Sequence, residues 1–338
     1  MLGVAALVVA GVVSLIALEG GGPSASPPDS THPTTPSTTP LPKPPFAVGT
    51  LTLTLTEPGR SGAAARTLPT TVRYPAAGAA GEPAPTGAAA QRAGGPYPLV
   101  IFSEGFGYDP EAYAALLNAW AVAGYVVVDP VYPFTSPTSP GGLVEGDIVT
   151  HPADLSFVIT SMLGDSVASG GTLTGMIDPH QIGVIGQSDG GDLSLAVADN
   201  TCCRDSRIKA AVILSGAELA WFQGAYYTQP AVPMLVVQGT DDTVNPPSCS
   251  VQLYNQAPQP KYYLSMAGQT HLSAYTQAGQ PLDVVANVTT DFFNGYLKGS
   301  TTALGAVVAD GTVPGLASLT NASSVPPNDQ PCPDAPAN

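Results

Sequence analysis

Residues 181–191 read QIGVIGQSDGG, and residues 188–198 are expected to form a helix. The first five residues are expected to form a strand. Gly186, Ser188 and Gly190 then match the pattern G-x-S-x-G at a strand-to-helix turn. Such a turn strains the backbone of its serine, and glycine on either side avoids clashes. The stretch therefore predicts a nucleophilic Ser188 at the carboxyl end of a strand.

Strands and helices alternate on both sides of this turn. Two strands over 49–56 and 69–75 come first, with alternating or mixed polarity. The further expected strands cover 97–103, 125–129, 208–214, 234–238 and 262–266, and the further expected helices cover 109–122, 150–163 and 282–297. This alternation predicts an α/β fold, with a mostly parallel sheet covered by helices on both faces and entered through antiparallel strands.

A serine nucleophile needs a histidine base, and the chain offers four histidines. His32 lies in a Pro- and Thr-rich segment. His151 begins the helix before the nucleophile strand, and His180 lies at the opposite end of that strand from the serine. His271 remains, in a loop after the last sheet strand. We therefore expect His271 to be the base.

The acid that orients the histidine should lie between the serine and the histidine in chain order. Asp241 and Asp242 follow the expected strand 234–238, so either could serve. The serine, the acid and the histidine would then all lie at carboxyl ends of parallel strands. The backbone N–H groups of Phe106, in the loop after strand 97–103, and of Asp189 are expected to form the oxyanion hole.

Several aromatic residues follow the expected strand 208–214. Trp221, Phe222, Tyr226 and Tyr227 lie within seven positions of one another. They predict either a substrate pocket at the carboxyl end of the sheet or ordinary core packing.

These residues resemble the α/β-hydrolase family, and within it the secreted bacterial group related to dienelactone hydrolase, chlorophyllase and the larger platelet-activating-factor acetylhydrolases. The resemblance spans about residues 48–298. The matching motifs are 71–75 (TVRYP), 102–107 (FSEGFG), 152–157 (PADLSF), 178–179 (DP), 186–191 (GQSDGG), 239–246 (GTDDTVNP) and 268–271 (GQTH). It implies an eight-stranded sheet, no cofactor, no metal, and ester hydrolysis through an acyl-enzyme. The resemblance also implies that Asp242 is the acid that orients the histidine.

The chain departs from that family at two positions. Glu104 stands where the family often has histidine. It is either a plain loop residue or a negative charge that disfavours anionic substrates. Asp189 follows the nucleophile where an apolar residue is common, and its carboxylate is expected to cap the following helix.

Composition excludes some partners. The 338 residues include 10 Lys and Arg against 25 Asp and Glu, for a net charge of −15. A negative surface repels nucleic acids and other polyanions. Four cysteines and four histidines are too few and too scattered for a zinc finger or an iron–sulfur site.

The chain divides into four expected parts. Residues 2–18 form an apolar run with Ser14 as its one polar member, and residues 1–19 are expected to be a signal peptide or a membrane anchor. Residues 20–46 predict a disordered linker rich in Pro, Thr and Ser, residues 47–300 the catalytic domain, and residues 301–338 a loose tail. An apolar N-terminal segment followed by a linker and a domain predicts a secreted or extracytoplasmic protein.

The four cysteines are consistent with an exported protein, because disulfide bonds form outside the cytoplasm. Cys202 and Cys203 are neighbours, and a bond between neighbours is strained, so each is expected to pair with Cys249 or Cys332. A bond to Cys332 would staple the tail to the domain. The alternative is four free thiols.

The predicted function is a serine hydrolase of neutral carboxylic esters, either small or polymeric, as in a cutinase-like enzyme. Two alternatives remain. An acyltransferase would use the same site and differ only in its acceptor. A catalytically weak hydrolase fold would serve as a cell-surface binding protein.

Overall fold

The computed structural model describes residues 44–60, 64–80, 86–139, 141–228, 230, 232–328 and 330–333. The predictions for the signal peptide or anchor over 1–19, for most of the linker over 20–46, and for His32 lie outside these residues. Among the described helices, none is long and apolar enough to span a membrane.

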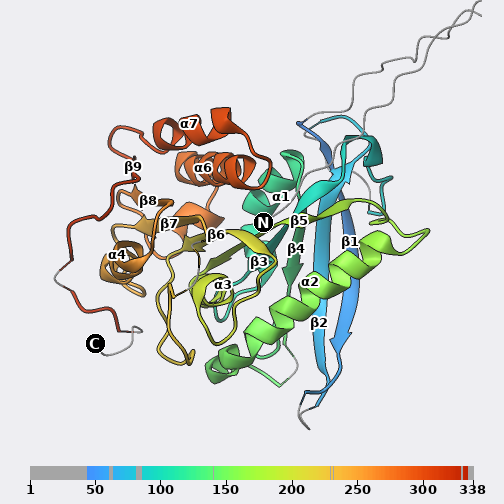
Figure 1. Ribbon diagram of the computed structural model, residues 1–338, viewed down its shortest axis with the longest axis horizontal. Coiled ribbons are helices and arrows are strands. Elements are labelled where there is room, and N and C mark those ends of the chain that lie inside the picture. The colour runs from blue at the N-terminus through green and yellow to red at the C-terminus, as the bar shows by residue number, and fades with distance from the viewer. Residues whose placement is uncertain are drawn as a thin grey trace, which may run out of the picture. The chain divides into compact units, whose positions relative to one another are not determined.

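One nine-stranded sheet forms the centre of the molecule, in the order β1-β2-β4-β3-β5-β6-β7-β8-β9 (Figure 1). The strands are β1 (Ala47–Glu57), β2 (Arg66–Ala76), β3 (Tyr97–Ser103), β4 (Val126–Pro130), β5 (Ile177–Gln187), β6 (Ile208–Leu214), β7 (Met234–Gly239), β8 (Lys261–Met266) and β9 (Ala317–Thr320). The strands from β3 to β8 run parallel to one another, whereas β1, β2 and β9 pair antiparallel with their neighbours. This confirms the predicted fold class.

Helices cover both faces of the sheet. They are α1 (Ala114–Val122), α2 (His151–Val167), α3 (Asp189–Asp199), α4 (Pro247–Gln256), α5 (Ser273–Thr276), α6 (Gln280–Tyr296) and α7 (Thr301–Asp310). Apolar residues of α2, α3 and α4 share one core cluster, whereas those of α1, α6 and α7 share a second cluster on the other face. The sheet therefore has a separate hydrophobic core on each side.

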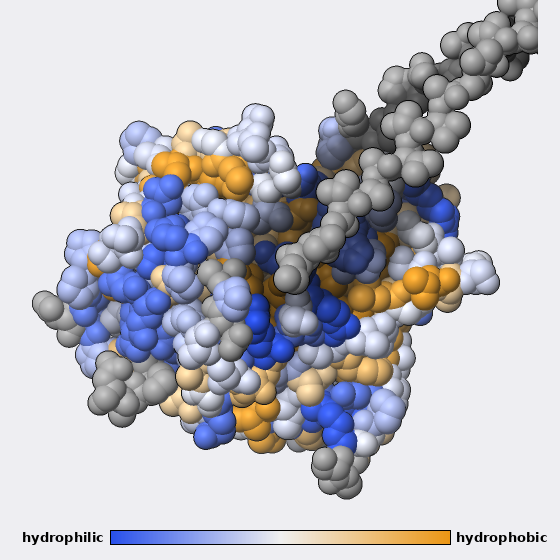
Figure 2. Space-filling view, viewed as in Figure 1, coloured by the Kyte–Doolittle hydropathy of each residue, from blue (hydrophilic) through white to orange (hydrophobic). Residues whose placement is uncertain are grey.

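The position of a strand in the sheet explains its sequence pattern. All seven residues of β3 are buried, because helices cover both of its faces, and its sequence is a continuous apolar run. The edge strand β1 instead alternates half-buried leucine with exposed threonine over much of its length. Hydrophobic residues on the face in Figure 2 form small patches among hydrophilic ones.

The C-terminal region differs from the expected loose tail. Residues 301–320 form α7 and β9, and β9 extends the sheet beside β8, with Leu264 paired to Leu319. Val307 and Leu319 are buried in the core, so this part of the region contributes apolar surface to the fold. The sheet consequently has nine strands where eight were expected.

The predicted cysteine pairing is wrong. Cys249 is bonded to Cys332, and Cys202 is bonded to Cys203. Helix α3 starts at the carboxyl edge of the sheet and its 11 residues carry the chain about 16 Å toward the opposite edge, where Cys202 and Cys203 follow. Cys249 instead lies in the first turn of α4, near the carboxyl edge. The expected staple between Cys332 and the domain is present, and two disulfides are compatible with an extracellular protein.

Candidate active site

Ser188 lies at the turn between β5 and α3, as its motif predicts. Its φ is 56°, in the left-handed region that side chains rarely adopt. A Cβ atom on Gly186 would collide with the backbone of Gly190, and one on Gly190 would collide with the backbone of Ser103. Both glycines are therefore required for α3 to approach β3 and β5 closely enough to form this turn.

Asp242 lies beside His271. Its Oδ2 atom is 2.8 Å from His271 Nδ1, and its side chain is fully buried. Its Oδ1 accepts the backbone N–H groups of Val244 at 2.9 Å and Asn245 at 3.0 Å. An ionised carboxylate only accepts, so Nδ1 of His271 carries the proton and Nε2 is left with a lone pair. Asp241 is exposed, and its carboxylate accepts instead from the Thr240 hydroxyl.

Two glutamines that the sequence analysis missed hold this pair. Gln238 on β7 donates its Nε2 to Asp242 Oδ2 at 3.0 Å, while its Oε1 accepts from Ser250 Oγ at 2.5 Å. Gln187 donates its Nε2 to the backbone carbonyl of His271 at 3.0 Å and accepts from the Tyr113 hydroxyl at 2.7 Å. Gln187 precedes the nucleophile directly, which is the one sequence signal that could have singled it out.

Ser188 and His271 open into one cavity of about 610 Å³. Its walls come mostly from loops that follow the carboxyl ends of the parallel strands. The lining residues are Phe106, Tyr108, Glu145, Gln187, Ser188, Asp189, Asp192, Leu219, Ala220, Trp221, Val244, Asn245, His271, Leu272 and Pro333. The other described histidines lie elsewhere: His151 is buried and stacked on Tyr132, and His180 is exposed at the far end of β5.

The predicted oxyanion donors flank the serine. Asp189 follows Ser188 directly, and Phe106 follows Gly105, where an added Cβ atom would lie 3.2 Å from that of Ser188. Within the described part of the chain, no acceptor is recorded for the Phe106 N–H. An N–H group without a protein partner at the cavity can bind a developing negative charge.

Glu104 lies under this loop, outside the cavity wall. It is 1% exposed, and its Oε1 accepts the Tyr132 N–H at 3.1 Å. Burial raises the pKa of Glu104 well above its ordinary value, because the charged form loses its hydration. Because the carboxyl is buried and does not line the cavity, the structure favours the interpretation of Glu104 as a loop residue over that of a repulsive charge at the site.

The predicted aromatic pocket is only partly present. Trp221 lines the cavity and is 46% exposed. Phe222 does not line it, since it packs in a small cluster with Ile148, Ala196 and Leu219. Tyr226 bridges to Asn200 and packs against the core. The segment over 221–227 consists of turns, bends and one isolated bridge and forms no helix or strand, so neighbours in sequence do not share an environment. Tyr108 and Val244 line the cavity instead and were not predicted.

No group of three or more His, Cys, Asp or Glu side chains that could hold a metal ion occurs among the described residues.

Comparison with known families agrees with this architecture. Residues 152–301 match a family model described as PET hydrolase-like. The matched range contains Ser188, Asp242 and His271. The chain has the α/β-hydrolase fold. At the level of the family, the match supports an ester hydrolase. No curated protein matches its sequence.

Proposed function

We propose that this α/β-hydrolase cleaves neutral carboxylic esters through an acyl-enzyme on Ser188. The observation that supports this most strongly is the convergence of three residues far apart in the chain. A strained Ser188 and His271 line the same cavity, and His271 is hydrogen-bonded to buried Asp242 at 2.8 Å. A nucleophile, a base and an orienting acid are the groups that acyl transfer requires.

In the proposed acylation, His271 Nε2 removes the proton from Ser188 Oγ as the oxygen attacks the ester carbonyl carbon. The carbonyl π electrons move onto oxygen, which the N–H groups of Phe106 and Asp189 stabilise. The intermediate then expels the alcohol, which takes the proton from His271. Asp242 keeps the imidazole oriented and stabilises its charged form.

In deacylation, water takes the place of the alcohol. His271 removes one proton from water as the oxygen attacks the acyl carbon, and the second intermediate expels Ser188 Oγ. The serine recovers its proton from His271, and the carboxylic acid leaves. The sum is one ester and one water converted to one acid and one alcohol.

The cavity lining supports a neutral substrate with an apolar part. Trp221, Leu219 and Val244 offer apolar contact, whereas Glu145 and Asp189 place carboxylates in the lining. A negatively charged substrate would be repelled by these groups and by the net charge of −15. The PET hydrolase-like match makes an aromatic polyester the first polymer to test.

The decisive test measures p-nitrophenyl ester hydrolysis, with acyl chains from acetyl to palmitoyl, by the wild type and Ser188→Ala. We expect the substitution to lower kcat by at least about 10³-fold, because the nucleophile is lost. Ser161→Ala on α2, whose hydroxyl binds the Phe157 carbonyl, is the matched control and should retain activity. Equal activity in Ser188→Ala would contradict the proposal. Added alcohols that become new esters would instead favour an acyltransferase.

A further inference from the structure

The C-terminal segment over 321–333 follows helix α4 from its last turn back to its first. The Tyr254 hydroxyl donates to the carbonyl of Ala322, and the Asn255 side chain exchanges two hydrogen bonds with the backbone of Val325, at 3.0 and 2.9 Å. Nearer the start of the helix, Ser248 Oγ donates to the Pro331 carbonyl at 3.4 Å. The segment ends at the carboxyl edge of the sheet, where the site lies.

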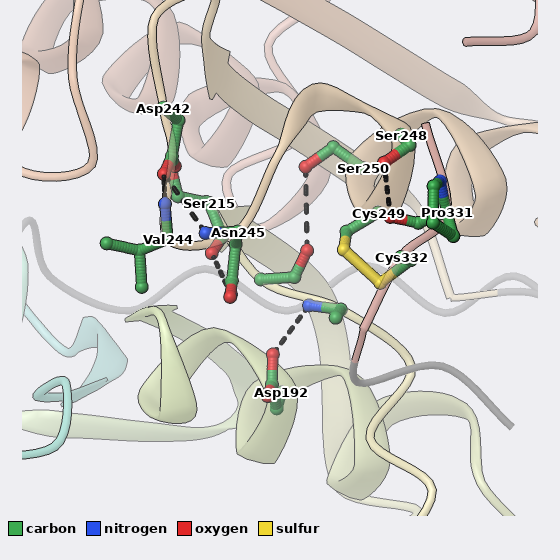
Figure 3. The surroundings of a disulfide bond; sticks show 12 residues. Asp192, Ser215, Asp242, Val244, Asn245, Ser248, Cys249, Ser250, Pro331 and Cys332 are labelled. Carbon is green, nitrogen blue, oxygen red and sulfur yellow. Dashed lines mark hydrogen bonds between the residues drawn. A yellow bond between two sulfur atoms is a disulfide. The ribbon is translucent and has the colours of Figure 1, made fainter. Parts of the chain in front are cut away.

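Little hydrophobic burial holds this segment. Most of its described residues are exposed, and Val325 is its one apolar side chain packed against the core. The disulfide between Cys249 and Cys332 is therefore the strong attachment at its end, with Cα atoms 4.7 Å apart (Figure 3). Cys249 is fully buried in the first turn of α4, so the anchor itself is rigid.

The end of the segment reaches the active-site cavity. Pro333, next to the bonded Cys332, lines the same cavity as Ser188 and His271. It also lines a second cavity of about 700 Å³ formed by the loop over 240–247 and by Asn328, Gln330 and Pro331. Val244 and Pro333 belong to the walls of both cavities. The segment therefore lies where the two spaces adjoin.

We propose that residues 331–333, held by the Cys249–Cys332 disulfide, are a specificity-determining wall of the substrate cleft that limits the size of the ester group bound on this side. This inference rests on the proposed function. With the wall in place, a bulky group on this side of Ser188 meets Pro333. Without it, the cavity of about 610 Å³ joins the neighbouring space, and larger esters fit.

The same helix turn also bears on the catalytic acid. Ser250, one residue after Cys249, donates to Gln238, which in turn donates to Asp242. Loss of the disulfide could thus lower the rate for every ester by loosening α4. A wall acts differently, since it changes the ratio of rates between large and small esters. That ratio is the readout that separates the two roles.

The test compares kcat/KM for p-nitrophenyl acetate and for p-nitrophenyl naphthoate. In Cys249→Ser/Cys332→Ser, we expect the ratio of naphthoate to acetate to rise about tenfold over the wild type. Cys202→Ser/Cys203→Ser removes the other disulfide, which has no residue in either cavity, and should leave the ratio unchanged. Pro333→Gly keeps the disulfide but removes the ring from the wall, and should raise the ratio even if the double variant folds poorly.

A ratio within twofold of the wild type in both Cys249→Ser/Cys332→Ser and Pro333→Gly would overturn the wall, whatever happens to the absolute rates. Failure of the proposed function is distinguishable. In that case both rates would survive Ser188→Ala, and both proposals would fall. If both rates depend on Ser188 but the naphthoate-to-acetate ratio does not change in the variants, the proposed wall is rejected and the proposed function stands.

Discussion

At the scale of single residues, two adjacent aspartates in one loop have different environments. Asp242 is buried and hydrogen-bonded to His271, whereas Asp241 points to solvent and binds Thr240. The chain spacing is compatible with either as the acid. What separates them is the direction in which the loop turns after β7, which two backbone N–H groups bound to Asp242 Oδ1 stabilise.

We expect Asp242→Asn to lower kcat by about 10³- to 10⁴-fold, because an amide nitrogen facing Nδ1 favours the wrong imidazole tautomer. Asp241→Asn is the matched control and should stay within about twofold of the wild type. Steady-state kinetics on a short p-nitrophenyl ester measure both. If Asp241→Asn instead caused the large loss of kcat, the acid would be Asp241.

The buried carboxyl of Glu104 makes the free energy of unfolding depend on pH. Its raised pKa means that the folded state binds this proton more tightly than the unfolded chain does. Its stabilising contribution is present below the ordinary pKa of 4.5 and is lost as pH rises toward the raised value. The wild type should lose up to about 1.4 kcal/mol of unfolding free energy per pH unit from this group.

Glu104→Gln removes the titrating proton, so we expect a flatter dependence of unfolding free energy on pH as the pH rises above 4.5, the ordinary pKa of the carboxyl. Urea unfolding at several pH values measures the slope. Parallel slopes for the wild type and Glu104→Gln would show that the carboxyl does not titrate in this range upon unfolding. Absolute stability is not the readout, because the added amide hydrogens lack an evident acceptor at the position of Glu104 Oε2.

At the scale of elements, the antiparallel entrance to the sheet depends on a buried ion pair. Arg73 on β2 lies 2.5 Å from Asp129 on β4, and both side chains are at most 4% exposed. Arg73 also binds the exposed Glu111, at 2.8 Å. A charge pair inside the sheet is costly to bury and more costly to break, since one partner then remains buried alone.

Arg73→Met should therefore lower the unfolding free energy by about 3–5 kcal/mol. Arg73→Met/Asp129→Leu removes both charges and should recover most of that loss. Urea unfolding of the two variants checks this. A double variant as unstable as the single one would mean that side-chain packing, and not the unpaired carboxylate, causes the loss.

At the scale of the whole molecule, the two disulfides constrain very different lengths of chain. Cys249 and Cys332 are 83 positions apart, whereas Cys202 and Cys203 are adjacent. In the chain-entropy view, a disulfide stabilises by restricting the unfolded chain, and more so for longer loops. Only the first joins the C-terminal segment to the domain.

Cys249→Ser/Cys332→Ser should lower the unfolding free energy by up to about 4.5 kcal/mol. Cys202→Ser/Cys203→Ser should cost only about 1 kcal/mol, because its loop is minimal. Chemical denaturation under non-reducing conditions compares them. Equal losses for the two pairs would contradict the loop-length argument.

Three features could be predicted from the amino-acid sequence alone: the fold class, the order of the main strands along the chain, and the turn that bears Ser188. These depend on rules that act between near neighbours: buried parallel strands need continuous apolar runs, and the tight turn needs glycine at 186 and 190. His271 followed by elimination, because few histidines exist and the carboxyl ends of parallel strands meet at one edge.

Three other features emerge only from the folded chain: the disulfide pairing, the glutamines behind Asp242 and His271, and the course of the C-terminal segment past the cavity. The tertiary structure also moved Phe222 and Tyr226 from the expected pocket into packed positions. Each of these depends on distances between residues far apart in the chain. Such distances are set by how helices pack on the sheet, which neither spacing nor composition encodes.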